Sequence, residues 1–420
     1  MRLLLIHPKF QYRGKDLFPI GLGYLASVAR DKAEVSVLDE NVEAFDAEKI
    51  RDINPDIVGI TATTPSFSRA VEIVRAIKEI NAKARVIMGG THVTFAPEDA
   101  LKAGADVVIR GEGEATLAEL LESSNLEKIK GISYVEDGKI FHNPDRELIK
   151  DLDEVPFPAR EYFPLKNYRI MSLVTSRGCP YSCSYCASTR FWRQMVRFRS
   201  PENVIEELKQ ISELGFKLVR FMDSTFTLDQ RRAVKICELI KESNTGIKWS
   251  CETRADFISD ELLEALRNAG CTLLCIGVDS GSQEVLDKCR RSIGVATMKE
   301  AFEKIREYGI ATRAYVTFSF PGETEKTVRE TIRFLEEVKP EQTLLSLATA
   351  YPGTELWSGG TVEVHPNWVA KFHGHGVGGR LYFPEGMTKK EYVRLAEEMW
   401  KAVKKLNSEA AGVKKHGLAG

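Results

Sequence analysis

Three cysteines in one short segment carry the clearest chemical signal in this sequence. Cys179, Cys183 and Cys186 lie in the segment SRGCPYSCSYC with the spacing C-x3-C-x2-C. Three thiolates in one loop can bind three irons of a 4Fe–4S cluster and leave the fourth iron without a protein ligand. A cluster made only for electron transfer is normally closed by a fourth cysteine. The spacing therefore predicts an iron–sulfur cluster with one iron open to another molecule.

A structural zinc site is the alternative interpretation of these thiols. Such sites usually take four ligands in paired knuckles. No second cysteine pair follows at knuckle spacing, so we favour the cluster. The remaining cysteines have no cluster spacing, and we expect small buried hydrophobic residues rather than ligands of a second cluster. They are Cys237, Cys251, Cys271, Cys275 and Cys289.

The composition bounds the organisation of the chain. Its 420 residues are too many for one ordinary core, so we expect two or three domains. The formal net charge of −1 gives no signal for nucleic acid or an anionic membrane as a partner. No stretch approaches the ~20 apolar residues that span a bilayer, and the start, MRLLLIHPKF, indicates a buried strand rather than a signal peptide. We therefore expect a cytoplasmic protein, in which disulfides are rare.

The first 125 residues alternate short apolar segments with helical ones. This alternation predicts a doubly wound, flavodoxin-like α/β domain with a parallel sheet, whose ligands bind at the carboxyl ends of the strands. The expected strands are 3–6, 35–38, 56–60, 85–89 and 106–110. The loops after three of them are small, polar and glycine-rich, which lets a large flat ligand approach the backbone. These loops are TATTPSF (61–67), GGTHVT (89–94) and GEGEAT (111–116).

The rest of the chain divides into a linker, a second domain and a tail. Residues 126–168 contain a predicted hairpin around Asp137-Gly138 and then a proline-rich connector. Residues 169–385 resume the alternation with six strand–helix units, which predicts a partial (β/α)6 barrel with its chemistry at the carboxyl ends of the strands. Residues 386–420 are expected to form a helix over 388–406, capped by Thr388 and Glu391, and a tail. The expected barrel strands are 170–175, 218–222, 248–253, 272–278, 312–318 and 343–349.

The cysteine motif, with Tyr185 directly before its last cysteine, resembles the radical SAM superfamily. In that family the open iron chelates the amino and carboxylate groups of S-adenosylmethionine (SAM). Reduction then cleaves SAM to methionine and a 5′-deoxyadenosyl radical, which removes a hydrogen atom from the substrate. The resemblance also implies an electron donor such as ferredoxin or flavodoxin.

Five later segments resemble family motifs in their order along the barrel. They are FMDSTFT (221–227), CETRAD (251–256), GVDSGSQEVL (277–286), FPGET (320–324) and YPGTEL (351–356). Many relatives have glutamate where this chain has Asp279, which leaves the contact of this shorter acid open. The resemblance implies SAM contacts from Tyr185, Asp223, Ser224, Glu252, Arg254, Asp279 and Ser280.

The first domain resembles the cobalamin-binding domain of cobalamin-dependent (class B) radical SAM enzymes. The segments PIGLGYLASVA (19–29), GGTHVT and GADVVIRGEGEATL (104–117) carry the resemblance. The motif D-x-H-x-x-G is absent, and neither His7 nor His92 supplies it, so we expect no histidine beneath the cobalt. The alternative is a flavodoxin-like domain that binds nothing or only helps the chain to dimerise. The implied cobalamin contacts are Thr61, Thr63, Thr64, Ser66, Gly89, Gly90, His92, Gly111, Glu112 and Gly113.

As a function, the resemblance implies a cobalamin-dependent radical SAM methyltransferase that moves a methyl group from SAM to an unactivated carbon of an unknown substrate. Cyclisation or rearrangement without methyl transfer is the first alternative, and a cobalamin- or redox-sensing protein is another. A methylthiotransferase is disfavoured because residues 1–178 contain no cysteine for the second cluster which that family needs. His373 and His375, in HGHGVGGR (373–380), form a possible substrate loop, although a plain loop is the favoured interpretation.

Overall fold

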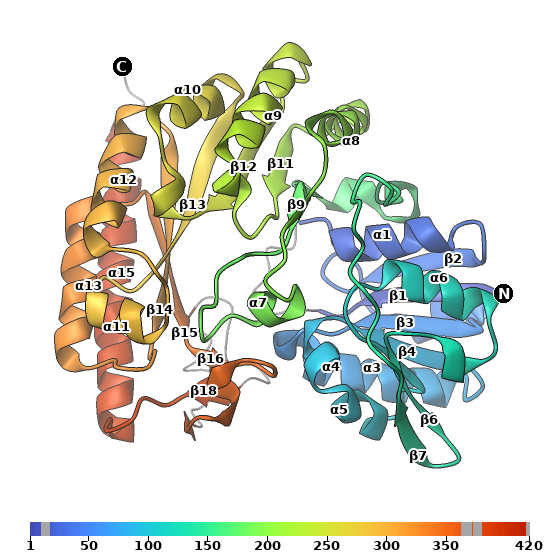
Figure 1. The fold of residues 1–420 in the computed structure, drawn as a ribbon. Helices are drawn as coiled ribbons and strands as arrows, with labels where there is room; N and C mark the ends of the chain where they lie inside the picture. The colour runs from blue at the N-terminus through green and yellow to red at the C-terminus, as the bar shows by residue number, and fades with distance from the viewer. Residues whose placement is uncertain (10–16, 363–371, 373–379, 417–420) are drawn as a thin grey trace. The chain divides into compact units, whose positions relative to one another are not determined.

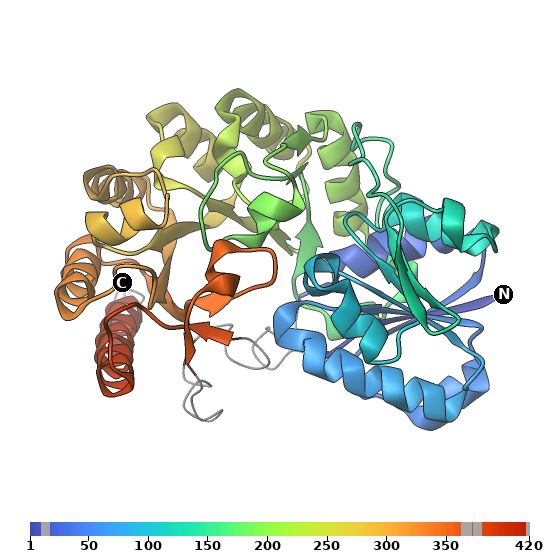
Figure 2. The ribbon, with the colours of Figure 1, turned by 60° about the horizontal axis from the view of Figure 1, so that its bottom comes forward.

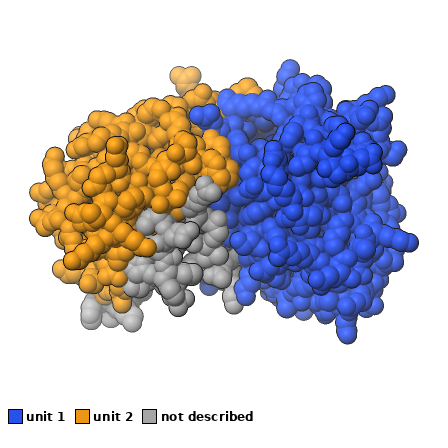
Figure 3. Space-filling view, turned by 90° about the horizontal axis from the view of Figure 1, so that it is seen from below, with its two compact units in different colours: residues 1–172, 190–193 blue, residues 173–189, 194–420 orange. Residues whose placement is uncertain are grey.

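The computed structural model forms two compact units (Figure 1). One unit comprises Met1–Ser172 with Arg190–Arg193, and the other comprises Leu173–Thr189 with Gln194–Gly420 (Figure 3). Among the residues that the structure describes, no helix is both long enough and apolar enough to cross a membrane. The described residues are 1–9, 17–362, 372 and 380–416.

The first unit is built on a seven-stranded sheet with the order β2-β1-β3-β4-β5-β6-β7. The first five strands in this order, β2 to β5, pair with one another in parallel, as predicted, which confirms the α/β class. The hairpin at Asp137-Gly138 also forms, and it pairs antiparallel with β5, so the sheet is mixed. The strands are β1 (Arg2–His7), β2 (Glu34–Asp39), β3 (Ile57–Thr61), β4 (Arg85–Gly89), β5 (Val107–Ile109), β6 (Ile132–Glu136) and β7 (Lys139–His142).

Helices cover both faces of this sheet. Helices α1 and α6 lie on one face, and α3 to α5 lie on the other (Figure 1). On α3 the buried positions Ala70, Ile73, Val74 and Ile77 follow the helical period and join the apolar side chains of β1, β3 and β4 in one core. The helices are α1 (Ile20–Ala29), α2 (Ala47–Ile53), α3 (Phe67–Ile80), α4 (Thr91–Phe95), α5 (Pro97–Lys102) and α6 (Glu114–Glu122).

The second unit contains a six-stranded parallel sheet with the order β15-β14-β13-β12-β11-β8. Each strand is joined to the next by a helical crossover, as expected for the predicted partial barrel. The strands of this sheet are β8 (Met171–Leu173), β11 (Leu218–Phe221), β12 (Lys248–Thr253), β13 (Cys271–Asp279), β14 (Ala311–Phe318) and β15 (Gln342–Leu347). Short strands also form: β9 (Ser176–Arg177), β10 (Arg197–Phe198), β16 (Thr349–Ala350), β17 (Thr361–Val362) and β18 (Arg380–Tyr382).

The helices of the second unit lie along the outside of an arc of strands (Figure 2). On β14 the residues that face these helices are buried and apolar or small, and Phe318 packs edge-on against Tyr392. The alternate residues of β14 are only partly buried, so the sheet has an apolar outer face and a more open inner face. The helices are α7 (Ala187–Phe191), α8 (Pro201–Glu213), α9 (Gln230–Glu242), α10 (Asp260–Asn268), α11 (Gln283–Lys288), α12 (Val295–Glu307), α13 (Glu325–Val338) and α15 (Lys389–His416).

The C-terminal helix α15 begins as the sequence predicts. The backbone N–H of Thr388 donates to Glu391 Oε2, and the N–H of Glu391 donates to Thr388 Oγ1, which together form a capping box. The helix continues to His416, beyond the predicted end at residue 406. Its Asn407 pairs with the backbone of Thr343 on β15 in both directions, at 2.7 and 2.9 Å, and so fixes the helix to the sheet.

Candidate functional site

The cysteine loop follows β9 and runs without regular secondary structure to α7. It begins at Gly178, whose φ is +108°, and a Cβ atom there would lie 1.8 Å from the carbonyl oxygen of Met195. No other residue fits this position, because any side chain would collide with rigid backbone. The far side of the loop is held by backbone bonds, since Ser184 N–H donates to Cys289 O at 3.1 Å and Ser184 O accepts from Glu355 N–H at 3.1 Å.

The three predicted cluster ligands lie in this loop as free, partly exposed thiols. Burial raises the pKa of Cys179, Cys183 and Cys186, so the thiols must lose protons when a metal binds. In the described parts of the chain, no three His, Cys, Asp or Glu side chains converge on a single metal position. Each cysteine of a 4Fe–4S cluster binds a different iron. The three thiols lie along one loop, and a donor set of thiols alone fits an iron–sulfur cluster.

Asp279 and Tyr185 are two predicted SAM contacts that meet each other. The Tyr185 hydroxyl donates to Asp279 Oδ2 at 2.8 Å, and Arg291 Nε donates to the same oxygen at 2.5 Å. Asp279 ends β13 with a positive φ of 63°, a conformation that costs free energy for a residue with a side chain. The phenol of Tyr185 also packs on Phe320, with ring centroids 4.4 Å apart. These contacts fix the orientation of the residue before Cys186.

Arg254 and Ser280 are also held by local partners. The Arg254 guanidinium pairs with Asp256 at 2.7 Å and stacks over the ring of Tyr181 at 3.7 Å. Ser280 is buried and shares a hydrogen bond with Thr331 at 3.1 Å. Both residues lie directly beyond the carboxyl end of a strand, which is where this class of barrel places its chemistry.

Asp223 differs from the other predicted SAM contacts because its carboxylate is enclosed. It accepts hydrogen bonds from Thr175 N–H at 3.2 Å, Thr175 Oγ1 at 2.7 Å and Ser176 Oγ at 2.5 Å. Burial raises the pKa of Asp223, and these hydrogen bonds act against that rise. The side chain thus holds the segment that leads into the cysteine loop. The adjacent Ser224 is exposed.

Glu252 lies on the inner face of the sheet, where it forms an ion pair with Arg220 at 2.6 Å. Three further residues of this region, Arg220, Arg291 and Thr175, were not predicted from the sequence. Arg291 follows the motif GVDSGSQEVL by five residues, and a cation so close to an acidic motif is the one signal that marks it in the sequence. Arg220 and Thr175 lie within strand patterns that carry no such mark.

In the first unit, seven of the predicted cobalamin contacts lie at the last residues of β3 and β4 or in the segments that follow these strands. Thr63 and Ser66 form a capping box at a short 3₁₀ turn, where Thr63 N–H donates to Ser66 Oγ at 3.0 Å. Gly90 has a φ of +111°, and a Cβ atom there would lie 2.6 Å from the carbonyl oxygen of Ala62. Glycine thus lets the two loops touch. Thr61 and Gly89 are the paired last residues of β3 and β4.

His92 is buried in this part of the first unit. Its Nδ1 shares a hydrogen bond with Thr64 Oγ1 at 3.1 Å, its ring stacks on Phe67, and its Nε2 lies 3.5 Å from Asp99 Oδ2. Burial lowers the pKa of His92, which outweighs the opposing effect of Asp99. These contacts hold the imidazole inside its own domain.

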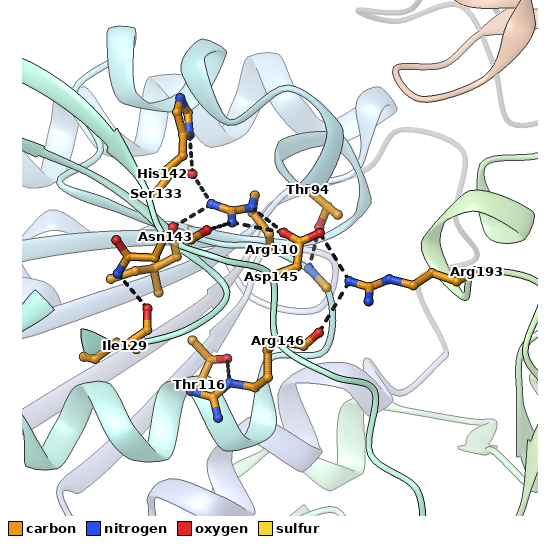
Figure 4. Close-up of polar contacts among 12 residues, drawn as sticks. Thr94, Arg110, Thr116, Ile129, Ser133, His142, Asn143, Asp145, Arg146 and Arg193 are labelled. Carbon is orange, nitrogen blue, oxygen red and sulfur yellow. Dashed lines mark hydrogen bonds and ion pairs between the residues drawn. The ribbon is translucent and has the colours of Figure 1, made fainter. Parts of the chain in front are cut away.

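The loop after β5 is braced from both sides. Gly111 N–H donates to Thr94 Oγ1 at 3.0 Å, and buried Glu112 accepts from Ile149 N–H at 2.8 Å. Just before the loop, Arg110 donates to the backbone of Ile132. Its guanidinium also lies 3.0 Å from Asp145 Oδ1, and Figure 4 shows these two side chains facing each other. A Cβ atom on Gly111 would meet nothing within 4 Å, so the backbone is open there.

Gly113, the last of the predicted contacts in this loop, begins α6 as its N-terminal cap. The ends of β3, β4 and β5 share one edge of the sheet, which is where a ligand binds in such domains. Open backbone and small hydroxyl side chains at that edge suit a large, amide-rich ligand such as cobalamin. His373 and His375, the possible substrate loop, lie outside the described residues.

Comparison with known proteins identifies a family for each of the two domains. A model of the radical SAM superfamily matches residues 173–335, and a model of the B12 binding domain matches residues 10–121. A relative from Pyrococcus horikoshii, named as an uncharacterized methyltransferase, is 35% identical and covers 85% of this chain and 82% of its own length. The anaerobic magnesium-protoporphyrin IX monomethyl ester cyclase of Rubrivivax gelatinosus is 29% identical and covers 87% of this chain and 71% of its own length.

A solved structure shares the fold over nearly the whole chain. The radical S-adenosylmethionine methyltransferase TsrM from Kitasatospora setae, with tryptophan substrate and a SAM analog bound, matches with a TM-score of 0.77. The match covers 96% of this chain and 89% of that chain at 20% identity. At this identity the likeness establishes the two-part fold and nothing finer.

Proposed function

This chain belongs to the radical SAM superfamily, among the members that carry a B12 binding domain, and we propose that it is a methyltransferase acting on a carbon atom of its substrate. Its cofactors are a 4Fe–4S cluster, SAM and cobalamin. When bound, they supply a carbon radical for hydrogen abstraction and a methyl group for transfer.

The match to the Pyrococcus horikoshii relative carries the proposal, because it extends over both domains and that protein is named as an uncharacterized methyltransferase. A match limited to one domain would say nothing about how the two sets of cofactors are used together. The residues of the chain hold the cofactors in position. Cys179, Cys183 and Cys186 would hold the cluster, and the Tyr185–Asp279–Arg291 contacts keep the adjacent loop in one orientation.

In the first unit, the edge of the sheet at the ends of β3, β4 and β5 is where we expect the ligand to bind. Gly90 lets the loops after β3 and β4 pack against each other, and the backbone at Gly111 is open, so a macrocycle can approach it there. Glu112 and Thr94 hold the loop that contains Gly111 through hydrogen bonds to backbone N–H groups. We propose that this edge binds cobalamin, and that the buried His92 supports the loops rather than the cobalt.

Cyclisation without methyl transfer is the second candidate, since the cyclase of Rubrivivax gelatinosus is also similar over both domains. The two candidates differ in what they make from SAM. Methyl transfer through cobalamin yields S-adenosylhomocysteine together with 5′-deoxyadenosine. A radical cyclisation yields 5′-deoxyadenosine alone.

The test uses the full chain, purified anaerobically with cobalamin supplied, and measures iron, cobalt and both SAM products after reduction. About four irons and one cobalt per chain, with both products formed, is the result that we expect. A Cys183→Ala variant should lose 5′-deoxyadenosine, because the cluster would lack a ligand. Formation of 5′-deoxyadenosine without S-adenosylhomocysteine would favour the cyclisation, and iron without cobalt would refute both candidates.

A further inference from the structure

The inner face of the six-stranded sheet carries a connected group of polar side chains. Successive strands contribute Arg220 from β11, Glu252 from β12, Cys275 from β13, Arg313 and Tyr315 from β14, and Gln342 from β15. The strand register places Glu252 beside Cys275, Cys275 beside Arg313, and Arg313 beside Gln342. We call these six residues the inner-face group.

The alternation along β14 shows which face these residues occupy. Thr312, Ala314, Val316 and Phe318 are buried, and Phe318 contacts Tyr392 on the helix outside the sheet. Arg313 and Tyr315 alternate with them and therefore point to the opposite face. The contact between Tyr315 and Arg220, at 2.7 Å, spans the two strands between β14 and β11. The inner-face group thus lies across the inside of the arc.

The two arginines of the group have different partners. The Arg220 Nη2 atom donates to Glu252 Oε1 at 2.6 Å, so its charge is met by a carboxylate. Arg313 Nε donates to Gln342 Oε1 at 2.7 Å, and its Nη1 lies 3.9 Å from Cys275 Sγ. Within the described residues, these neutral groups are the side-chain partners of Arg313.

The charges of the group do not cancel. Burial raises the pKa of the Cys275 thiol and of the Tyr315 phenol, so both groups are neutral near pH 7. The group then contains two guanidinium cations and one carboxylate. A partly buried cation without a counter-charge costs free energy, and an anion bound from solution offsets that cost. The Glu252 side chain is 34% exposed and Arg313 is partly exposed, so an incoming ligand can reach both of them.

We propose that Arg313 is the anchor of a binding site for an anionic group of the substrate, a carboxylate or a phosphate. A guanidinium is suited to either anion, because its planar N–H groups can donate two parallel hydrogen bonds to the two oxygens. This inference rests on the proposed function, since it takes the inner face to be where the enzyme receives its substrate.

The position of Arg313 also limits the shape of that substrate. Arg313 lies five residues before Phe318, the last residue of β14, which is roughly 16 Å along a strand. Chemistry in such barrels takes place at the carboxyl ends of the strands. The substrate is therefore an elongated molecule, with its anionic group at one end and its reacting carbon at the other.

Isothermal titration tests the site without turnover. Inorganic phosphate and succinate are titrated separately into the anaerobic full chain with its cofactors, at constant ionic strength. We expect saturable binding of at least one anion, weakened about tenfold or more by Arg313→Gln. The matched control is Arg333→Gln, which removes an exposed cation from the outer helix α13 and should change nothing. Arg313→Lys keeps the charge and should bind more tightly than Arg313→Gln.

A SAM titration separates the substrate from the cofactor, because SAM also carries a carboxylate. Unchanged SAM affinity in Arg313→Gln is the expected result. If that variant loses SAM affinity but keeps its affinity for phosphate and succinate, the proposal is overturned and Arg313 serves the cofactor. It is equally overturned if the wild type shows no saturable anion binding, or if the Gln and Lys variants lose affinity alike. These readouts need no methyl transfer, so they remain decisive even if the proposed function fails.

Discussion

Asp223 and Thr175 are joined by two hydrogen bonds, from the backbone N–H of Thr175 at 3.2 Å and from its hydroxyl at 2.7 Å. Thr175 lies four residues before Cys179, so Asp223 sets the path of the chain into the cysteine loop. The carboxylate of Asp223, which was predicted to contact SAM, thus accepts hydrogen bonds from groups of the protein. The geometry assigns Asp223 a positioning role, and the contact with SAM stays a prediction.

Replacing Asp223 with asparagine should therefore reduce iron content. The amide replaces one acceptor oxygen with a donor and leaves a buried group from Thr175 or Ser176 unpaired, at a cost of about 1–3 kcal/mol. Iron per chain and SAM affinity are the two measurements. The exposed variant Asp287→Asn is the control and should retain its iron. Full iron content with weakened SAM binding would instead make Asp223 a direct contact.

Gly178→Ala should prevent stable cluster binding. The new Cβ atom would collide with the carbonyl oxygen of Met195, and the positive φ adds strain of about 1–2 kcal/mol. Gly215→Ala is a matched control, because Gly215 has a φ of +86° but no atom within 4 Å of the added Cβ. We expect full iron content in the control and little in Gly178→Ala, measured after identical anaerobic reconstitution. Equal iron in both would show that the loop yields to the collision.

The sequence predicted elements better than it predicted side-chain partners. The strand at 248–253 and the hairpin at Asp137-Gly138 form as expected, because residue pattern and turn chemistry act over a few neighbours. That the hairpin would extend the first sheet was not predicted, since edge pairing depends on residues distant in the chain. The helix predicted to end at 406 runs on through Gly412, because the neighbouring Glu409, Ala410 and Ala411 outweigh the cost of one glycine, about 1 kcal/mol.

In the candidate site too, local features were predicted from the sequence and contacts between distant residues were not. The spacing of the three cysteines is local, and it indicated the cluster directly. Arg291 contacts Asp279 because the loop after α11 folds back on β13. Thr175 contacts Asp223 although it lies 48 residues before it in the chain. Neither spacing corresponds to a helical or strand period, so no pattern in the sequence marks these pairs.

The Asp279–Arg291 pair should show strong energetic coupling. Its side chains are 14% and 8% exposed, so removing one partner leaves a largely buried charge unpaired, at a cost of roughly 3–5 kcal/mol. A double-mutant cycle with Asp279→Asn and Arg291→Gln, followed by urea unfolding, measures the coupling. The exposed pair Arg290–Glu355 is the control and should couple by about 0–1 kcal/mol. Similar coupling in both pairs would contradict the expectation.

Glu323 should make the stability of the chain depend on pH. Its carboxyl is buried, accepts from Thr327 Oγ1 at 2.6 Å, and has its pKa raised by burial from 4.5 to about 7. The folded chain then binds more protons than the unfolded chain between these values, so stability falls as pH rises from 4.5 to about 7. The full loss is roughly 3–4 kcal/mol.

Urea unfolding at pH 5 and pH 7.5 tests this in the wild type and in Glu323→Gln, which keeps the shape of the side chain without its charge. The variant should lose less stability than the wild type between the two pH values. Glu325→Gln is the control: the pKa of Glu325 is lowered, chiefly by its hydrogen bond from Arg394, so its stabilising effect is already complete above pH 5. If the wild type and Glu323→Gln give parallel pH profiles, Glu323 keeps its charge in the folded chain, and burial is not what controls its protonation.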